Sequence, residues 1–210
     1  MASADSFDIE IVYELFTKCG RDDGRIDMDG YAEAFDELCK LFNLLGTVFT
    51  FVTSDVHEKI GILRAYRQSE LAKQYETVSD MIHYEVENKL TNKKTKPLSG
   101  SRTLLRLHRA LEFVIDFMTA VTQMEISKKL TSIAGESYQK TLAKHHPWVI
   151  RKAVGVAMYT LPTGEQLLSK MGKHDMDKTL ELMNGVIQLA QPIYDEIQTI
   201  YTSNNLHNLA

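Results

Sequence analysis

Hydrophobic residues recur along most of the chain at intervals of three and four positions, the spacing of one face of an α-helix. The strict alternation and the runs of Val, Ile and Thr that are typical of β-strands do not occur in the sequence. The pattern therefore predicts an all-α fold of about eight helices, separated by breaks rich in Gly and Pro. The predicted helices span residues 8–19, 29–63, 66–92, 100–124, 132–144, 147–159, 163–171 and 175–202.

The segment 29–63 has the widest apolar face. Its apolar positions are Tyr31, Ala34, Phe35, Leu38, Leu41, Phe42, Leu45, Val48, Phe49, Val52 and Val56. A long helix with such a face is buried over much of its length. We therefore expect a helical sandwich with this helix in its middle.

Composition indicates an ordinary globular protein, which we interpret as one domain spanning residues 1–210. Hydrophobic residues make up 44% of the chain and charged residues 25%. The formal net charge of −4 is not the basic excess of a nucleic-acid-binding protein, so no nucleic-acid partner is expected. Cys19 and Cys39 have neither metal-ligand spacing nor the density of a secreted disulfide scaffold, which favours the reducing cytosol.

The sequence gives no sign of insertion into a membrane. Residues 1–8 lack the basic start and apolar run of a signal peptide. The longest uncharged stretch, Leu41–Ser54, is shorter than the ~20 residues that span a bilayer.

Residues 25–30 imitate the middle of a calcium-binding EF-hand loop, with Asp36 where the last ligand would stand. Arg25 occupies the first ligand position, however, and its charge repels calcium. Asp27 and Asp29 are instead expected to cap the following helix. We expect no metal and no cofactor, since the adjacent histidines 145 and 146 point apart and no other ligand set is evident.

Charged residues interrupt the apolar face of the helix predicted for 29–63. The stripe through Val48 and Val52 runs into Asp55 and then Lys59. Asp55 lies about 60° around the helix from Val52. The pair can be an ordinary surface ion pair between positions i and i+4, which contributes only a few tenths of a kcal/mol.

The helix predicted for 100–124 repeats this pattern. Arg102, Arg106 and Arg109 share a stripe that continues into Phe113 and Phe117. Three guanidinium groups on one face repel one another unless an anion lies among them, and their planar donors match phosphate. The alternatives are a solvated basic face or ion pairs with the acidic residues of the same helix.

A histidine precedes the helix predicted for 147–159. Pro147 suits the first position of a helix, which would place His146 at the N-cap, where its imidazole can make one hydrogen bond. Together these segments offer a phosphate-binding basic cluster, one acid and one histidine beside two apolar stripes. That combination suits an amphiphile, since a carboxylate can accept from both the amide N–H and the hydroxyl of a sphingoid lipid.

Four segments resemble the glycolipid transfer protein family, and more closely its ceramide-1-phosphate transfer branch. They are Leu44–Phe49 leading to Asp55 and Lys59, Arg102–Leu111, His146–Val154 and Tyr159–Thr163. The resemblance covers nearly the whole chain in the same order. It implies a two-layer all-helical sandwich that encloses the hydrocarbon of a sphingolipid between its layers. It also implies a monomeric, cytosolic lipid carrier that is not an enzyme and touches membranes transiently.

The resemblance further implies roles for individual residues. The ceramide amide and hydroxyl would be bound by Asp55, the carbonyl by His146, and the phosphate by Lys59, Arg102 and Arg106. We add Arg109 as a supporting charge. The sugar-binding branch has Trp where Arg102 stands and Asn where Lys59 stands, so both residues favour phosphate over sugar.

The apolar stripes are expected to line a cavity for the lipid chains, because exposing a chain to water costs about 0.8 kcal/mol per methylene. The expected lining residues are Phe42, Leu45, Val48, Phe49, Val52, Phe113, Phe117 and Val154. Each of them can equally be a plain core residue. Lys93, Lys94 and Lys96 can contact anionic lipid or can belong to an ordinary solvated loop, and Phe35, Leu41 and Phe42 are candidates for apolar contacts with a membrane.

Three other functions share some of these features. Transfer of a glycosylceramide would use the same fold. An adaptor that senses the lipid without moving it would have the same pocket. An enzyme that cleaves phospholipids would need a nucleophile or a metal set near the phosphate, and the sequence shows no supporting motif.

Overall fold

The computed structural model describes residues 6–46, 49–92 and 96–209. Regular structure in these residues is helical, with three isolated β-bridges as the only strand-like pairing there, so the predicted fold class is confirmed. The helices are α1 (Ile9–Cys19), α2 (Met28–Leu45), α3 (Thr50–Arg67), α4 (Val78–Glu87), α5 (Gly100–Gln123), α6 (Thr131–Thr141), the short 3₁₀ helix η2 (Ala143–His145), α7 (Trp148–Met158), α8 (Gly164–Leu168) and α9 (Met176–Ser203).

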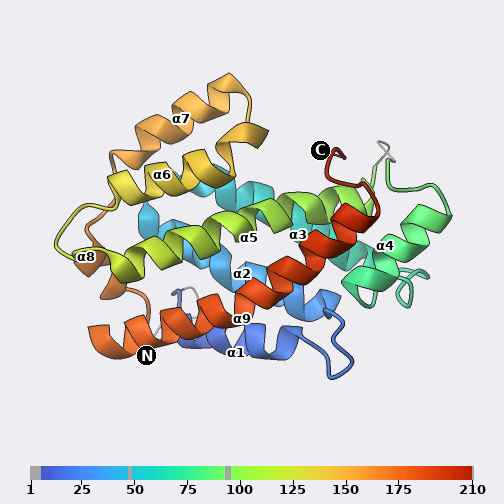
Figure 1. Ribbon diagram of the computed structural model, residues 1–210, viewed down its shortest axis with the longest axis horizontal. Coiled ribbons are helices and arrows are strands. Elements are labelled where there is room, and N and C mark those ends of the chain that lie inside the picture. Colours follow the sequence, from blue (N-terminus) through green and yellow to red (C-terminus); the bar gives the residue numbers. More distant parts are fainter. Residues whose placement is uncertain (1–5, 47–48, 93–95, 210) are drawn as a thin grey trace.

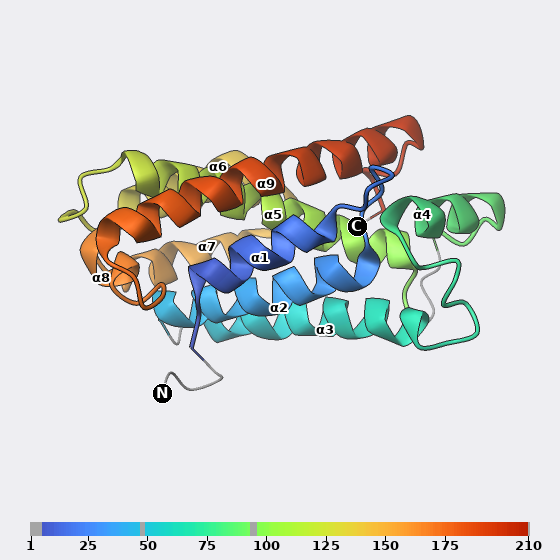
Figure 2. The same ribbon diagram turned by 90° about the horizontal axis from the view of Figure 1, so that it is seen from below.

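The helices pack in two layers around an apolar core. Figure 2 shows α2 and α3 along one side of the molecule and α5, α6 and α9 along the other, with α1 packed against both α2 and α9. α5 runs along the long axis and contacts α3, α6 and α9, whereas α7 lies outermost, against α6 (Figure 1). None of the described helices is both long enough and apolar enough to cross a membrane.

The single helix predicted for residues 29–63 is wrong, because this segment forms the two neighbouring helices α2 and α3. α2 ends at Leu45, and Gly46 follows with φ 123°, a conformation that residues with a side chain rarely adopt. Residues 47–48 lie outside the described part of the chain. Hydrophobic spacing alone missed the break because apolar positions continue on both sides of it.

The helix predicted for residues 66–92 is too long. After α3 the chain forms turns and bends over residues 68–76, and α4 is the only helix described in the rest of the segment. Leu71 and Tyr75 pack against the core from these turns, and so imitate helical spacing without a helix. The Thr77 side chain caps α4 by accepting a hydrogen bond from the backbone N–H three residues later.

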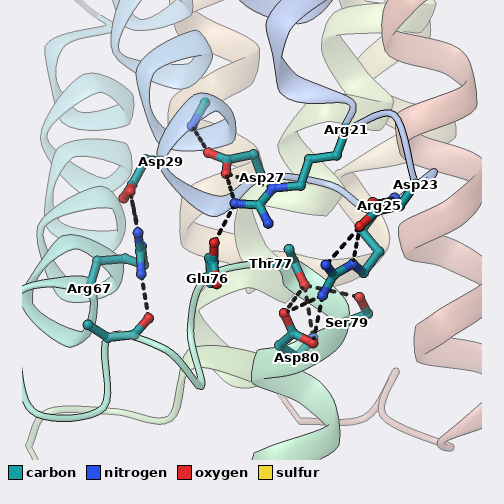
Figure 3. A network of polar contacts seen from close by, with 12 residues as sticks. Arg21, Asp23, Arg25, Asp27, Asp29, Arg67, Glu76, Thr77, Ser79 and Asp80 are labelled. Atoms are coloured by element: carbon teal, nitrogen blue, oxygen red, sulfur yellow. Dashed lines mark hydrogen bonds and ion pairs between the residues drawn. The ribbon is translucent and has the colours of Figure 1, made fainter.

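Arginines form ion pairs with the acidic residues in and around the segment 25–30, which imitates an EF-hand loop (Figure 3). Asp27 caps α2, as predicted, by accepting a hydrogen bond from the N–H of Gly30 at 2.8 Å. The predicted capping by Asp29 is wrong, because its carboxylate pairs with Arg67 at 2.7 Å. The other ion pairs join Arg21 to Asp27 and Glu76, and Arg25 to Asp23 and Asp80. The network ties the loop before α2 to the segments beside it.

A buried carboxylate holds the N-terminus of α5. Glu85 of α4 accepts hydrogen bonds from the N–H groups of Gly100 at 2.6 Å and Ser101 at 2.9 Å, and from the hydroxyl of Tyr75 at 2.6 Å. The first N–H groups of a helix have no partner within it, so this acceptor satisfies them. A Cβ atom on Gly100 would lie 2.3 Å from Sδ of Met81, so the close approach requires glycine. These contacts fix where α5 begins.

Candidate binding site

A cavity of about 700 Å³ is enclosed mainly by α3, α5, α6 and α7, together with the segment that follows α9. Its volume falls in the range of roughly 300–1,000 Å³ that is usual for small-molecule sites. Most of its wall is apolar and consists of Phe42, Phe49, Phe51, Val52, Val56, Leu107, Ala110, Phe113, Tyr138, Leu142, Pro147, Ile150, Val154 and Met158. The charged and polar residues in the wall are Asp55, Arg106, Arg109, His145, His146, His207 and Asn208.

Asp55 and Lys59 form the predicted ion pair on α3, with 2.8 Å between Oδ1 and Nζ. The two side chains differ sharply in exposure, since that of Asp55 is 57% exposed and that of Lys59 only 3%. Lys59 also contacts Glu58, with 3.1 Å between Nζ and Oε2. A surface ion pair has two solvated partners, whereas this one anchors an acid of the cavity wall on a buried ammonium group. Lys59 itself does not line the cavity.

Two of the three arginines in the α5 stripe, Arg106 and Arg109, line the cavity. Arg106 is exposed, and Arg109 is partly buried and donates to the carbonyl oxygen of His207 at 2.7 Å. Burial and the neighbouring Arg106 lower the pKa of Arg109. Arg102 lies one turn earlier and outside the wall, with a single long contact of 3.4 Å to Asn92 and a buried Nε that has no hydrogen-bond partner among the described residues.

The acidic residues of α5 do not neutralise this stripe. In the described part of the chain, neither Glu112 nor Asp116 forms an ion pair with any of the three arginines, and Asp116 pairs with Lys140 instead. The alternative that the stripe is a set of ion pairs within α5 is therefore wrong. The guanidinium groups remain available to an anion.

His146 lies in the wall beside the charged residues. Its Nδ1 is 2.9 Å from the hydroxyl oxygen of Tyr138. Burial lowers the pKa of His146, with Asp55 opposing this change and Arg109 adding to it. All three residues belong to the cavity wall. The pKa of His145 falls to about 4 through burial and the nearby positive charges. The predicted N-cap is wrong by one residue, because Pro147 is the cap and α7 begins at Trp148.

The predicted apolar lining coincides only partly with the wall. The residues that do line the cavity are Phe42, Phe49, Val52, Phe113 and Val154. Leu45 and Phe117 are buried in the core and do not line it; the ring of Phe117 stacks behind that of Phe113, with 5.8 Å between centroids. Val48 lies outside the described residues.

Several residues of the wall were not predicted. Ala110 lies on the arginine stripe between Arg106 and Phe113, and Ile150 and Met158 flank Val154 at helical spacing, so closer use of the same periodicity would have found them. The sequence holds no comparable signal for the segment after α9, which only the fold brings to the cavity.

The sequence profile of the glycolipid transfer protein family matches residues 26–173, well over half of the chain. The chain belongs to the glycolipid transfer protein family. Members of this family have a helical sandwich of the kind seen here, as the resemblance of the four segments had implied.

Several similar proteins within the family are ceramide-1-phosphate transfer proteins. That of Danio rerio is 35% identical over 209 residues, which cover 98% of this chain and 99% of its own. The crystal structure of the mouse protein matches with a TM-score of 0.92 at 32% identity, covering 97% of this chain and 100% of that one. The human protein in complex with 12:0 ceramide-1-phosphate has a TM-score of 0.90 at 30% identity, with the same coverage.

Proposed function

We propose that this protein binds ceramide-1-phosphate and transfers it between membranes. The observation that carries the proposal is a largely apolar cavity whose wall includes Asp55, His146 and two arginines that form no ion pair with a described carboxylate. Curated relatives that match nearly the full length at about 30–35% identity are named ceramide-1-phosphate transfer proteins, and the human one was crystallised with this lipid.

The charged groups complement the headgroup of such a lipid. The Asp55 carboxylate would accept from the ceramide amide N–H and hydroxyl, and His146 would bind the carbonyl oxygen. Arg106 and Arg109 would contact the phosphate from the wall, because guanidinium donors match its oxygens. Lys59 lies one turn beyond Asp55 and is buried beside it, and Arg102 lies one turn before Arg106. We assign both to the phosphate as well, as the resemblance to the family implied.

The apolar part of the wall would shelter the hydrocarbon. Each methylene moved from a bilayer into water costs about 0.8 kcal/mol, so a long chain leaves a membrane only into another dry environment. We propose a carrier and not an enzyme. The matching family model and the similar proteins are lipid transfer proteins, which supports this part of the proposal.

α7 presents an outer surface that suits contact with a membrane. Four large apolar residues are more exposed than any others in the described chain: Trp148, Val149 and Val156 of α7 and the following Tyr159 are 63%, 66%, 70% and 77% exposed. Lys152 lies beside Trp148, with Nζ 5.8 Å from the ring centroid, and Arg151 is also exposed. Exposed aromatic and basic residues on one helix are typical of an interfacial surface. This is where we place docking.

The residues that the sequence suggested as membrane contacts do not lie on this surface of α7. Phe35, Leu41 and Phe42 are buried, so their role as exposed docking residues is wrong. Lys93 and Lys94 lie outside the described residues, and Lys96 is exposed.

Replacing Trp148 by alanine is expected to lower transfer between vesicles roughly tenfold. A large exposed aromatic side chain contributes about 1.5–3 kcal/mol when it enters an apolar environment. Sedimentation with phosphatidylcholine vesicles containing phosphatidylserine should show a matching loss of membrane binding. Ile11→Ala on α1, which removes another exposed apolar side chain, is the control and should change neither quantity. Equal losses in both variants would remove α7 from the docking surface.

The test of the function is transfer between vesicles of fluorescent ceramide-1-phosphate and, in parallel, fluorescent galactosylceramide. We expect fast movement of the phosphate lipid and none of the sugar lipid above the rate without protein. Movement of the sugar lipid alone would make the protein a glycolipid carrier. Binding of ceramide-1-phosphate without movement would make it a sensor, and either result overturns the proposal.

The setting of this function is also a proposal. We propose a monomer that acts in the cytosol as one domain, residues 1–210. The two cysteines are buried and form no disulfide, which fits a reducing compartment. Burial raises the pKa of each thiol to about 12, so both are poorly reactive.

A further inference from the structure

A buried tyrosine lies directly behind His146. Tyr138 of α6 is 4% exposed, and its hydroxyl oxygen is 2.9 Å from Nδ1 of His146. The two ring centroids are 5.7 Å apart with an angle of 36° between the planes, so the rings do not stack and the hydrogen bond is their principal contact. Both residues belong to the cavity wall. The role of Tyr138 is not explained by the headgroup contacts proposed above.

The protonation states of the two groups decide which one donates. Burial raises the pKa of the Tyr138 phenol and lowers that of the His146 imidazole, so at neutral pH the phenol keeps its proton and the imidazole is uncharged. A neutral imidazole has one N–H and one lone pair. Within the described chain, Nδ1 is the one hydrogen-bond partner of this hydroxyl. A proton on Nδ1 would leave the buried phenol O–H without an acceptor, and a buried donor without a partner is unfavourable.

We propose that Tyr138 is a positioning residue that donates to Nδ1 of His146 and thereby keeps the imidazole proton on Nε2. Nε2 is then an N–H donor without a hydrogen-bond partner among the described residues, in the same cavity wall as the carboxylate acceptor of Asp55. A donor and an acceptor in one wall match the C=O and N–H of an N-acyl amide. The ester of a diacylglycerol lipid has no N–H, so the pair would favour ceramide lipids. This inference rests on the proposed function only in taking the amide to be that of a ceramide lipid.

The state of the imidazole can be measured without any lipid. Two-bond ¹H–¹⁵N spectra of protein labelled in histidine, recorded at pH 8, are expected to show the His146 proton on Nε2 and a hydrogen-bonded Nδ1 lone pair. His145 in the same spectra is the internal reference. A proton on Nδ1 in the unmodified protein would overturn the proposal, and this measurement needs no variant.

Tyr138→Phe gives a second test, because it removes the donor that holds the imidazole proton on Nε2. One hydrogen bond contributes about 0.5–1.5 kcal/mol, so at pH 8 the ratio of the Nδ1–H to the Nε2–H tautomer of His146 should rise roughly 2- to 10-fold in the same spectra. The other groups that act on His146 are Asp55 of α3, Arg109 of α5 and the adjacent His145, and all remain in the variant. An unchanged ratio of the two tautomers contradicts the proposal.

Transfer assays test whether the tautomer of His146 matters for binding of the lipid. Tyr138→Phe is expected to slow transfer of ceramide-1-phosphate roughly 3- to 10-fold, the effect of one hydrogen bond. Tyr13→Phe on α1 loses a hydroxyl far from the cavity and should transfer at the normal rate. An unchanged rate in Tyr138→Phe would refute the link to the ligand. If the unmodified protein moves no ceramide-1-phosphate, the proposed function fails, and the spectra without lipid still decide the role of Tyr138.

Discussion

Replacing Arg102 and Arg106 together by glutamine is expected to lower transfer of ceramide-1-phosphate by about a hundredfold or more. Each guanidinium would lose charge-assisted hydrogen bonds to phosphate, which contribute about 1.5–3 kcal/mol apiece. The stability of the protein should hardly change, because Arg106 is exposed and neither arginine has an ion-pair partner among the described residues. Transfer assays and thermal unfolding of the same samples measure both quantities.

The control for this double variant has to change the net charge equally. Lys128→Gln combined with Lys170→Gln also removes two positive charges, from exposed positions outside the cavity wall. If attraction to the membrane through overall charge were the cause, both double variants would lose activity alike. Normal transfer by the arginine variant would show that the headgroup site is assigned to the wrong residues.

Glu85→Leu is expected to lower the free energy of unfolding by about 3–5 kcal/mol. The change would leave the N–H groups of Gly100 and Ser101 and the hydroxyl of Tyr75 without their acceptor in the interior. Each unpaired buried group costs about 1–3 kcal/mol, and part of this is recovered as the site relaxes. Urea unfolding at pH 7, followed by circular dichroism, measures the loss.

Two further variants show whether the loss of stability comes from losing the buried hydrogen-bond acceptor or merely from removing an acidic side chain. Glu87→Leu changes an exposed carboxylate on the same helix and should shift stability by less than about 0.5 kcal/mol. Glu85→Gln keeps one acceptor oxygen and should fall between the other two. A leucine variant as stable as the unmodified protein would mean that α5 does not depend on this carboxylate for its position.

The sequence predicted helices well where a capping residue and the apolar period coincide. α5 begins one residue after Ser99, whose side chain accepts from the N–H of Arg102, and the predicted start at residue 100 was correct. Periodicity failed at Gly46 and over residues 68–76, because buried side chains follow one another at intervals of three and four whether or not the backbone between them is helical. Burial determines the pattern, and the backbone conformation is only inferred from it.

The candidate site shows a similar limit. Charges at apolar positions pointed to Asp55, Arg106 and Arg109, and the structure places all three in one cavity wall. The contact of Arg109 with His207 joins residues 98 positions apart, so no local pattern could have indicated it. A hydrogen bond such as that of Tyr138 depends on how α6 faces the turn after it, and periodicity carries no information about that geometry.

α7 has apolar side chains on two opposite sides. Ile150, Val154 and Met158 face the cavity, while Trp148 and Val156 are exposed on the outside. The partition between the cavity and an apolar exterior is therefore a single helix, about 10 Å across with its side chains. Its main helical neighbour is α6. A lipid hydrocarbon chain that entered from the outer side of α7 would therefore have to pass only one helix diameter to reach the cavity.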